Sequence, residues 1–224
     1  MSTKSRGLQG EKKVKTQLVK FKEYHKVLND ITFVVGKNEM SHQIDHILIH
    51  PHGVFVIETK NYYGEIISDT NDSFWLKIIN GTATRISNPI KQNKGHARVI
   101  NTLLKGKYEV IPVVVFVKNN APYVEDDNVI NMKDLRLMVE SHPYQKLLEK
   151  EDIDFIYKTL KGEKSKISKA EHLENIHYLK EVKEEFRLEM AYAIERHRCP
   201  RCEHDMKIEG NNWFCTGCDF KFKL

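Results

Sequence analysis

Two acids and a lysine in the first third of the chain offer the most specific chemistry in its sequence. The run GVFVIETK, residues 53–60, is apolar until it ends in Glu58 and Lys60, and the preceding run IDHILIH contains Asp45. Carboxylate oxygens are preferred ligands of Mg²⁺ and Mn²⁺, with water completing the coordination shell. An ion bound in this way polarises a phosphodiester and lowers the pKa of a bound water. These residue types therefore indicate hydrolysis of a phosphate ester.

The three side chains meet only if the two apolar runs form a hairpin. The turn chemistry between the runs is Pro51-His52, and a turn centred there places Asp45 opposite Glu58 and Gln43 opposite Lys60. Opposed residues share a face of the sheet, as do residues two apart on one strand. Opposed carboxylates repel, which favours a divalent cation between them. The alternative is that Glu58 and Lys60 only mark the exit of the strand to solvent and pair with each other.

The surrounding sequence predicts the elements that would hold this hairpin. Residues 8–24 have apolar side chains at helical intervals among lysines, which predicts an amphipathic helix. Residues 31–87 alternate β-prone runs with turn residues, which predicts a sheet. Asn88-Pro89 is typical of a helix N-terminus, and this helix is expected to continue to about Leu104. The β-branched run at residues 110–117 predicts a strand that is covered on both faces.

The remainder of the chain is expected to be helical before it reaches the tail. Two shorter helices are predicted near residues 132–141 and 144–161. The stretch 164–198 alternates acids and bases around apolar residues spaced three or four apart, which predicts a helix that links the domain to the tail.

Four ordered motifs of the first half resemble those of the nuclease-related (NERD) domain of the PD-(D/E)xK nuclease superfamily. They are Gly10-Glu11, Ile44-Asp45-His46, the run from Gly53 to Asn61, and Asn88-Pro89 with Gln92. A lone D…ExK pattern is weak, but four motifs in suitable structural contexts are specific. The resemblance covers about residues 5–118 and implies an α/β fold, a three-layer nuclease-like domain with a mixed central sheet.

The resemblance also implies roles for the acids and the lysine. Asp45 and Glu58 would bind Mg²⁺ or Mn²⁺, the backbone carbonyl of Thr59 would add a ligand, and Lys60 would be the catalytic lysine. The implied activity is metal-dependent hydrolysis of DNA phosphodiester bonds. Two alternatives stay open: a nucleic-acid-binding module that keeps the fold without cleaving, and a protein-interaction adaptor.

Residues on the two neighbouring helices complete the expected site. Glu11 and Gln92 match the flanking acid and glutamine of the family, although a solvated acid and a helix-bracing amide explain them equally well. His46 has the opposite parity to Asp45, so we expect it to pack in the core. His96 lies four residues after Gln92 on the same helical face and could approach a phosphate, but we do not include it in the site.

The tail carries a second metal-binding motif. Cys199-Pro-Arg-Cys202 and Cys215-Thr-Gly-Cys218 form two CxxC knuckles, whose four thiolates suit one tetrahedral Zn²⁺. Two disulfides or a redox-active CxxC are the alternatives. The stretch is too short to fold by burial alone, so metal binding would supply its folding free energy.

The tail resembles the zinc ribbon at the C-termini of bacterial type IA topoisomerases, which implies contact with DNA, particularly with single strands. Its acids and bases nearly balance, so we expect any such contact to come from Trp213 or Phe214 stacking on bases. Met206 and the two aromatic residues are also expected to form the small core of the ribbon.

The chain is therefore expected to have three parts: residues 5–120 as the NERD nuclease-like domain, 121–197 as a strand and helical extension with a linker helix, and 198–224 as the zinc ribbon. Its 224 residues are 40% hydrophobic and 30% charged, with a net charge of +5 that is compatible with a polyanionic partner. No apolar signal segment or bilayer-spanning run occurs, so we expect a cytoplasmic protein without a membrane partner.

Overall fold

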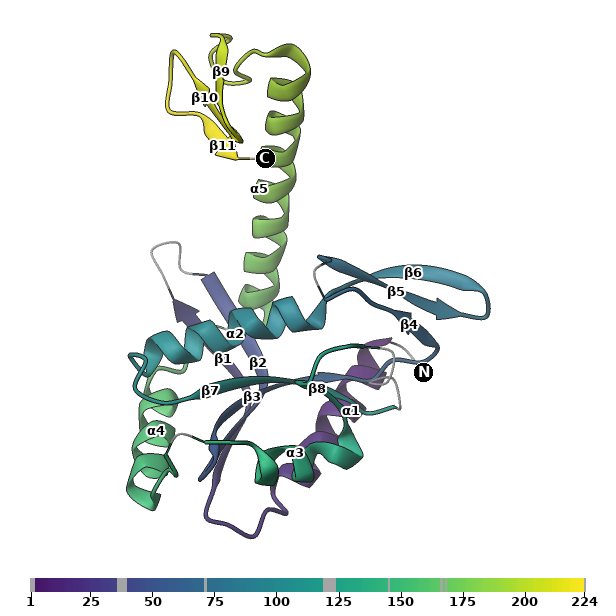
Figure 1. Ribbon diagram of the computed structural model, residues 1–224, viewed down its shortest axis with the longest axis vertical. Helices are drawn as coiled ribbons and strands as arrows, with labels where there is room; N and C mark the ends of the chain where they lie inside the picture. The colour runs from purple at the N-terminus through teal and green to yellow at the C-terminus, as the bar shows by residue number, and fades with distance from the viewer. Residues whose placement is uncertain are drawn as a thin grey trace. The chain divides into compact units, whose positions relative to one another are not determined.

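The computed structural model describes residues 3–35, 40–70, 72–118, 124–144, 146–165, 167 and 169–223 (Figure 1). Its contacts divide the chain into two compact units, Met1–Ile167 and Ser168–Leu224. The first unit contains α1 (Thr3–Leu18), β1 (Lys26–Val35), β2 (Met40–His50), β3 (Gly53–Lys60), β4 (Glu65–Ile67), β5 (Phe74–Ile79), β6 (Thr82–Ser87), α2 (Pro89–Leu103), β7 (Val110–Phe116), β8 (Val129–Asn131), the 3₁₀ helix η2 (Met132–Asp134), α3 (Leu135–Ser141) and α4 (Lys150–Gly162). The second contains α5 (Lys169–Arg196), β9 (Met206–Glu209), β10 (Asn212–Cys215) and β11 (Lys221–Lys223).

A five-stranded mixed sheet with the order β1-β2-β3-β7-β8 forms the middle layer of the first unit. β1, β2 and β3 pair antiparallel, whereas β7 runs parallel to both β3 and β8. Apolar side chains of α1 and α3 pack on one face of this sheet, and those of α2 and α4 pack on the other (Figure 1). The predicted three-layer α/β fold with a mixed central sheet is confirmed.

β3 is the central strand, and its sequence reflects cover on both faces. Val54 and Val56 pack into the core beneath α2 and α4, while Phe55 and Ile57 pack into the core beneath α1 and α3. All four side chains are fully buried. A strand between two helical layers needs apolar residues at every position, which explains why this run does not alternate.

The β2–β3 hairpin has the register that the sequence predicts. His50 pairs with Gly53, and Ile47 pairs with Val56. Gly53 has φ +138°, and a Cβ there would lie 2.6 Å from Cδ1 of Ile111. A glycine is therefore required at this tight turn, which fixes the start of β3 and with it the register of the hairpin.

Asn88 caps α2, as its sequence context predicts. Its Oδ1 accepts hydrogen bonds from the amides of Ile90 at 2.9 Å and Lys91 at 3.3 Å, and its Nδ2 donates to the carbonyl of Asp72 at 2.7 Å. Asp72 lies between β4 and β5 of a separate antiparallel sheet with the order β4-β5-β6. The buried Asn88 thus joins the start of α2 to this small sheet.

The second unit consists of α5 and a three-stranded antiparallel sheet with the order β11-β10-β9. Its core combines Ala193 of α5 with cysteine, methionine and aromatic side chains: Cys199, Met206, Trp213, Cys215, Phe220 and Phe222. Within the part of the chain that the structure describes, no helix has the length and the apolar character needed to cross a membrane.

Candidate functional site

The strands β2 and β3 separate beyond their shared hairpin. Their ladder ends at the pair His46↔Ile57. β2 then continues against β1 to the pair Val35↔Met40, while β3 continues against β7 to the pair Lys60↔Phe116. We call this divergence the fork and define it by Asp45, Glu58, Thr59 and Lys60. Polar side chains can enter the space between two diverging strands, which they could not do in a continuous ladder.

The fork brings the two acids and the lysine together. The amide of Thr59 donates to Oδ2 of Asp45 at 2.8 Å, and the Lys60 ammonium donates to Oε1 of Glu58 at 2.5 Å. Glu58 is only 4% exposed. The alternation along β2 and β3 puts these side chains on the face that α2 covers. Because Asp45 no longer pairs across the ladder, its carboxylate takes up the β3 amide instead.

α2 supplies side chains to the same place. Oε1 of Gln92 lies 3.3 Å from the Lys60 ammonium, and Nε2 of His96 lies 3.8 Å from Oε2 of Glu58. The buried Asn93 donates to the carbonyls of Val56 and Val113 at 2.9 Å each, which ties α2 to β3 and β7. His96 was left out of the expected site, although its spacing of four residues from Gln92 was the signal that could have found it.

The electrostatics of the fork are unbalanced in favour of negative charge. Burial, the neighbouring Glu58 carboxylate and, more weakly, Glu11 raise the pKa of Asp45 to about 8, against the opposing effect of the Thr59 amide. Burial alone would lower the pKa of Lys60, but Glu58 and Tyr62 beside it raise this pKa well above its ordinary value. One permanent positive charge therefore faces two carboxylates in a desolvated place.

Glu11 approaches the fork from α1. A Cβ on its neighbour Gly10 would lie 2.8 Å from Cβ of Asn61, and Nδ2 of Asn61 donates to the carbonyl of Arg6 at 2.8 Å. This close contact holds α1 against the end of β3. A groove of about 480 Å³, which we call the α1 groove, is lined by Leu8, Glu11, Lys12, Lys15, Thr16, Val19, Asn29, Asp30, Asp45 and His46. Asp45 can therefore be reached from this groove.

Two neighbours of Asp45 face other partners. Gln43 donates to Oδ1 of Asp30 at 2.5 Å, and β2 has left β3 before Gln43 is reached, so the predicted pairing with Lys60 is not formed. His46 packs on the opposite face, as expected, with Nδ1 2.7 Å from Oδ1 of Asn29. Burial, with a smaller contribution from Lys15, lowers the pKa of His46 to about 4.

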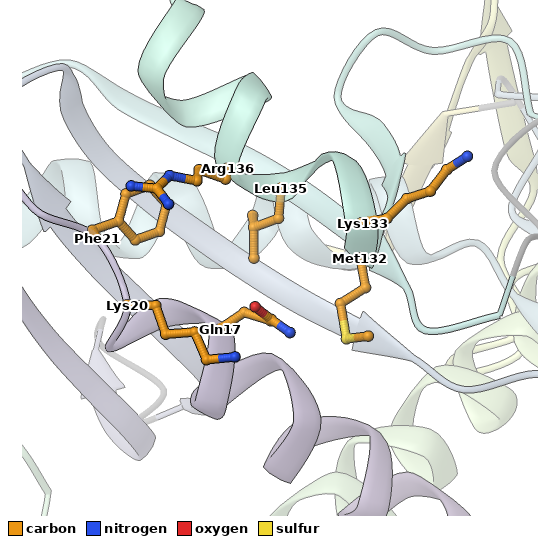
Figure 2. A pocket seen from close by; sticks show the side chains of 7 residues that line it. All are labelled: Gln17, Lys20, Phe21, Met132, Lys133, Leu135 and Arg136. Atoms are coloured by element: carbon orange, nitrogen blue, oxygen red, sulfur yellow. The ribbon is translucent and has the colours of Figure 1, made fainter.

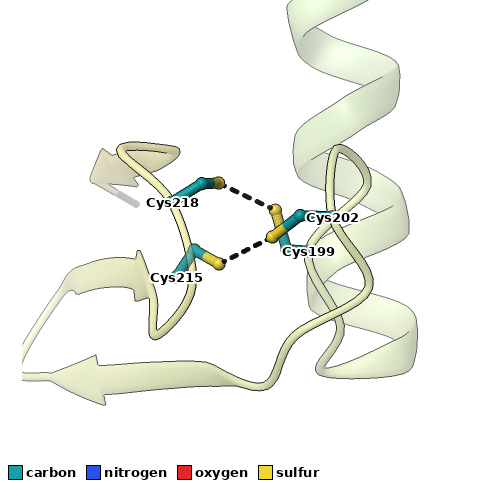
Figure 3. A group of neighbouring side chains, drawn as sticks. All are labelled: Cys199, Cys202, Cys215 and Cys218. Atoms are coloured by element: carbon teal, nitrogen blue, oxygen red, sulfur yellow. Dashed lines mark hydrogen bonds between the residues drawn. The ribbon is translucent and has the colours of Figure 1, made fainter.

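The four cysteines form a compact cluster in the second unit (Figure 3). All four Sγ atoms lie within 4.8 Å of one another, with 3.6 Å between Cys199 and Cys218 and 3.3 Å between Cys202 and Cys215. All four are free thiols, which excludes the disulfide alternative in this structure. Tetrahedral ligands about 2.3 Å from zinc are about 3.8 Å apart, so the cluster has the dimensions of a Zn²⁺ site.

Backbone amides complete the two knuckles. The amide of Arg201 lies 3.4 Å from Sγ of Cys199, and that of Gly217 lies 3.2 Å from Sγ of Cys215. Burial by itself would raise the pKa of the Cys215 thiol, but the Gly217 amide and the Cys202 thiol lower it to about 6. Amide donors at each knuckle stabilise thiolates, which are the form that zinc binds.

Trp213 lies inside the ribbon rather than on its surface. It is 6% exposed and stacks on Phe222, with the ring centroids 5.6 Å apart and 14° between the planes. A base cannot stack on a ring that is already covered, so this burial argues against the predicted role of Trp213 in nucleic-acid binding. Phe214 is partly exposed and stays a candidate for that role.

Known proteins show the same family signal. A family model described as the nuclease-related domain (NERD) matches residues 6–117, a span that includes the whole fork. An uncharacterized protein of Bacillus anthracis is 32% identical over 164 residues, which cover 70% of this chain and 76% of that protein. No solved structure matches the chain significantly.

Proposed function

The chain belongs to the nuclease-related domain family, and from this premise we propose that it is a metal-dependent nuclease that hydrolyses DNA phosphodiester bonds. The observation that carries the proposal is the fork. There the sheet opens, and two carboxylates, one lysine and the amide of Gln92 meet at one point. A structural ion pair needs one acid and one base, whereas this arrangement has an additional desolvated carboxylate.

A divalent cation fits the donor set of the fork. The pKa of Asp45 is raised because its charge is desolvated and repelled by Glu58, and no salt bridge to Asp45 forms among the described residues. Asp45, Glu58 and the carbonyl of Thr59 would hold Mg²⁺ or Mn²⁺ through hard oxygen ligands. When bound, such an ion polarises the phosphodiester and lowers the pKa of a bound water.

Lys60 has the features of a group that offsets charge in the transition state. Its ammonium is held by Glu58 and Gln92, and its raised pKa keeps it charged at neutral pH. A positioned cation in a desolvated site stabilises the negative charge that develops on the phosphate. Gln92 contributes by orienting Lys60, so it acts as a positioning residue.

The α1 groove supports DNA as the substrate. Lys12 and Lys15 line it alongside Asp45, and both are exposed. Lysines at this position would contact phosphates next to the scissile bond. The groove also contains Glu11 and Asp30, so its charge becomes favourable for a polyanion when the acids of the fork hold a cation. The proposal therefore includes DNA affinity that increases with Mg²⁺ or Mn²⁺.

The ribbon is proposed to bind Zn²⁺ and to assist DNA binding through Phe214. The four thiols have the spacing of a zinc site, and Phe214 is partly exposed beside Cys215. Base stacking on an aromatic ring tolerates any sequence, which suits an accessory contact to single strands.

The test is cleavage of supercoiled and single-stranded DNA by the full chain with Mg²⁺, Mn²⁺ or a chelator. The wild type should cleave only with metal, and Asp45→Asn should be inactive. The melting temperature should rise with metal in the wild type and stay constant in Asp45→Asn, because a ligand that binds only the native state stabilises it. Cleavage of equal rate in both proteins would show contamination and would overturn the assignment.

One observation favours a second candidate, a nucleic-acid-binding module that does not cleave. Lys60 already neutralises Glu58 through the 2.5 Å hydrogen bond, so a metal ion must compete with this lysine for the carboxylate. A chain that binds DNA with the same affinity in Mg²⁺ and in chelator, and cleaves in neither, would establish this alternative.

A further inference from the structure

A second pocket lies on the face of the sheet opposite the fork. Gln17, Lys20 and Phe21 at the end of α1 face Met132, Lys133, Leu135 and Arg136 of η2 and α3 across a cavity of about 330 Å³ (Figure 2). We call it the α1–α3 pocket. None of its lining residues belongs to the fork or to the α1 groove, so the proposed nuclease chemistry does not account for it.

The floor of the pocket is apolar and fixed. Leu135 is 1% exposed and Phe21 is 8% exposed, and both belong to the core between the sheet and the helices α1 and α3. Met132 and Gln17 project toward the space between the two helices in Figure 2. A rigid apolar floor with one amide beside it suits a flat organic group that makes few directed hydrogen bonds.

The rim of the pocket is positively charged. Lys20, Lys133 and Arg136 are exposed, and no carboxylate lines the cavity. Arg136 is partly neutralised by Glu140 at 2.6 Å, which leaves Lys20 and Lys133 without a salt bridge among the residues that the structure describes. The fold collects these charges from segments that are far apart in the sequence, and an anion would offset their mutual repulsion.

We propose that the α1–α3 pocket binds a nucleoside monophosphate, with its phosphate near Lys20 and Lys133 and its base against Met132, Phe21 and Leu135. The volume is at the lower end of the range of small-molecule pockets, which fits a ligand of mononucleotide size. The nucleotide is either free in solution or the 5′ end of a nucleic-acid strand. The inference does not rest on nuclease activity, because it uses none of the residues of the fork.

The probes are AMP, inorganic phosphate and adenosine, titrated calorimetrically into the full chain without added Mg²⁺ or Mn²⁺. AMP should bind about tenfold more tightly than either fragment, because it uses both the rim and the floor. The double variant Lys20→Ala/Lys133→Ala should weaken AMP binding by about tenfold or more. The matched control Lys13→Ala/Lys107→Ala removes the same charge from exposed positions outside the pocket and should leave AMP binding unchanged.

Competition separates the two sources of the nucleotide. Displacement of AMP by a 5′-phosphorylated oligonucleotide, but not by its 5′-hydroxyl form, assigns the pocket to strand ends. Displacement by neither assigns it to free nucleotides. No AMP binding at millimolar concentration would overturn the proposal. Equal losses in the pocket variant and the control would also overturn it, and so would equal affinity for AMP and phosphate, because the floor would then contribute nothing.

Discussion

The fork and the cysteine cluster both gather groups that suit a metal ion, but they differ in what surrounds these groups. The fork lies at the edge of a large core, with Ile47, Val56 and Ile100 fully buried beside it. The cysteines are themselves members of the small core of the second unit. A metal ion at the fork would therefore add to a fold that already exists, whereas zinc in the ribbon would supply much of the folding free energy. The position of a metal-binding group relative to the core decides whether the ion serves chemistry or stability.

The largest expected effect concerns the ribbon. Cys215→Ser should abolish the binding of about one Zn²⁺ per chain and unfold the ribbon, while the first unit stays folded, because structural zinc contributes on the order of 10 kcal/mol. Elemental analysis and limited proteolysis would measure both results. The exposed Lys221→Ala serves as control. A zinc-free wild type with oxidised cysteines would contradict the difference between the two regions.

The next effect concerns turnover at the fork. Lys60→Ala removes a positive neighbour but no proposed ligand, so the increase in melting temperature with Mn²⁺ should persist while cleavage falls by about 10²-fold or more. Rates of plasmid cleavage and melting curves at matched metal concentrations would show this separation. If the variant lost the metal-induced increase as well, Lys60 would act through metal binding rather than through charge in the transition state.

DNA binding should distinguish the two regions as well. Lys12→Ala/Lys15→Ala removes two proposed phosphate contacts, so the salt dependence of DNA affinity should decrease by about 0.7–0.9 per contact on a logarithmic scale. Phe214→Ala should weaken single-strand binding by about 1–3 kcal/mol without changing that salt dependence. Fluorescence anisotropy at several salt concentrations measures both, with Lys13→Ala as control. A reduced salt dependence in the Phe214 variant would contradict this division of roles.

A smaller effect is expected in the metal-free first unit. The pKa of Asp45 is raised to about 8, so its charged form destabilises the native state increasingly as the pH rises from about 4 to 8. Asp45→Asn carries no such charge and should be more stable than the wild type by about 1–3 kcal/mol at pH 8, and by less at pH 5. Urea unfolding in the presence of chelator measures this difference. A variant less stable than the wild type at pH 8 would show that the Thr59 hydrogen bond outweighs the repulsion.

The smallest effect concerns acid stability away from both metal sites. His50 is fully buried beside Phe21, and burial together with His52 lowers its pKa to about 4, despite the attraction of Glu23. Neutral His50 therefore contributes stability above its unfolded pKa of about 6.5, and this contribution of about 1–2 kcal/mol is lost as the pH falls toward 4. His50→Gln should flatten the pH dependence of unfolding between pH 7 and 5. The exposed His177→Gln should not, and a flattened profile in that control would contradict the assignment.

The local pattern of the sequence was sufficient for most elements of the first unit. Asn88-Pro89 predicted the start of α2, and the GVFVIETK run coincides with β3. The single turn at Pro51-His52 predicted the β2–β3 register as far as His46↔Ile57. These features depend on side chains that are neighbours along the chain, so spacing alone identifies them.

The family match and the zinc-type cluster also follow from short motifs, because the residues of each knuckle are three positions apart and their chemistry is specific. The roles of the fork residues stay predictions. The structure adds that Gln92 and His96 reach Lys60 and Glu58 from a separate helix, which no local pattern could establish.

By itself, then, the sequence determined the α/β class, the hairpin register and the set of residues that can bind metals, since these depend on alternation and on turn and ligand chemistry. Only the tertiary structure decided where β2 leaves β3, because that depends on the competing pairing with β1 and β7. It also decided that Trp213 is buried against Phe222 and that Lys20 meets Lys133 across a pocket. In each case the decisive contact joins residues that the sequence separates, and the packing of the surrounding core selects it.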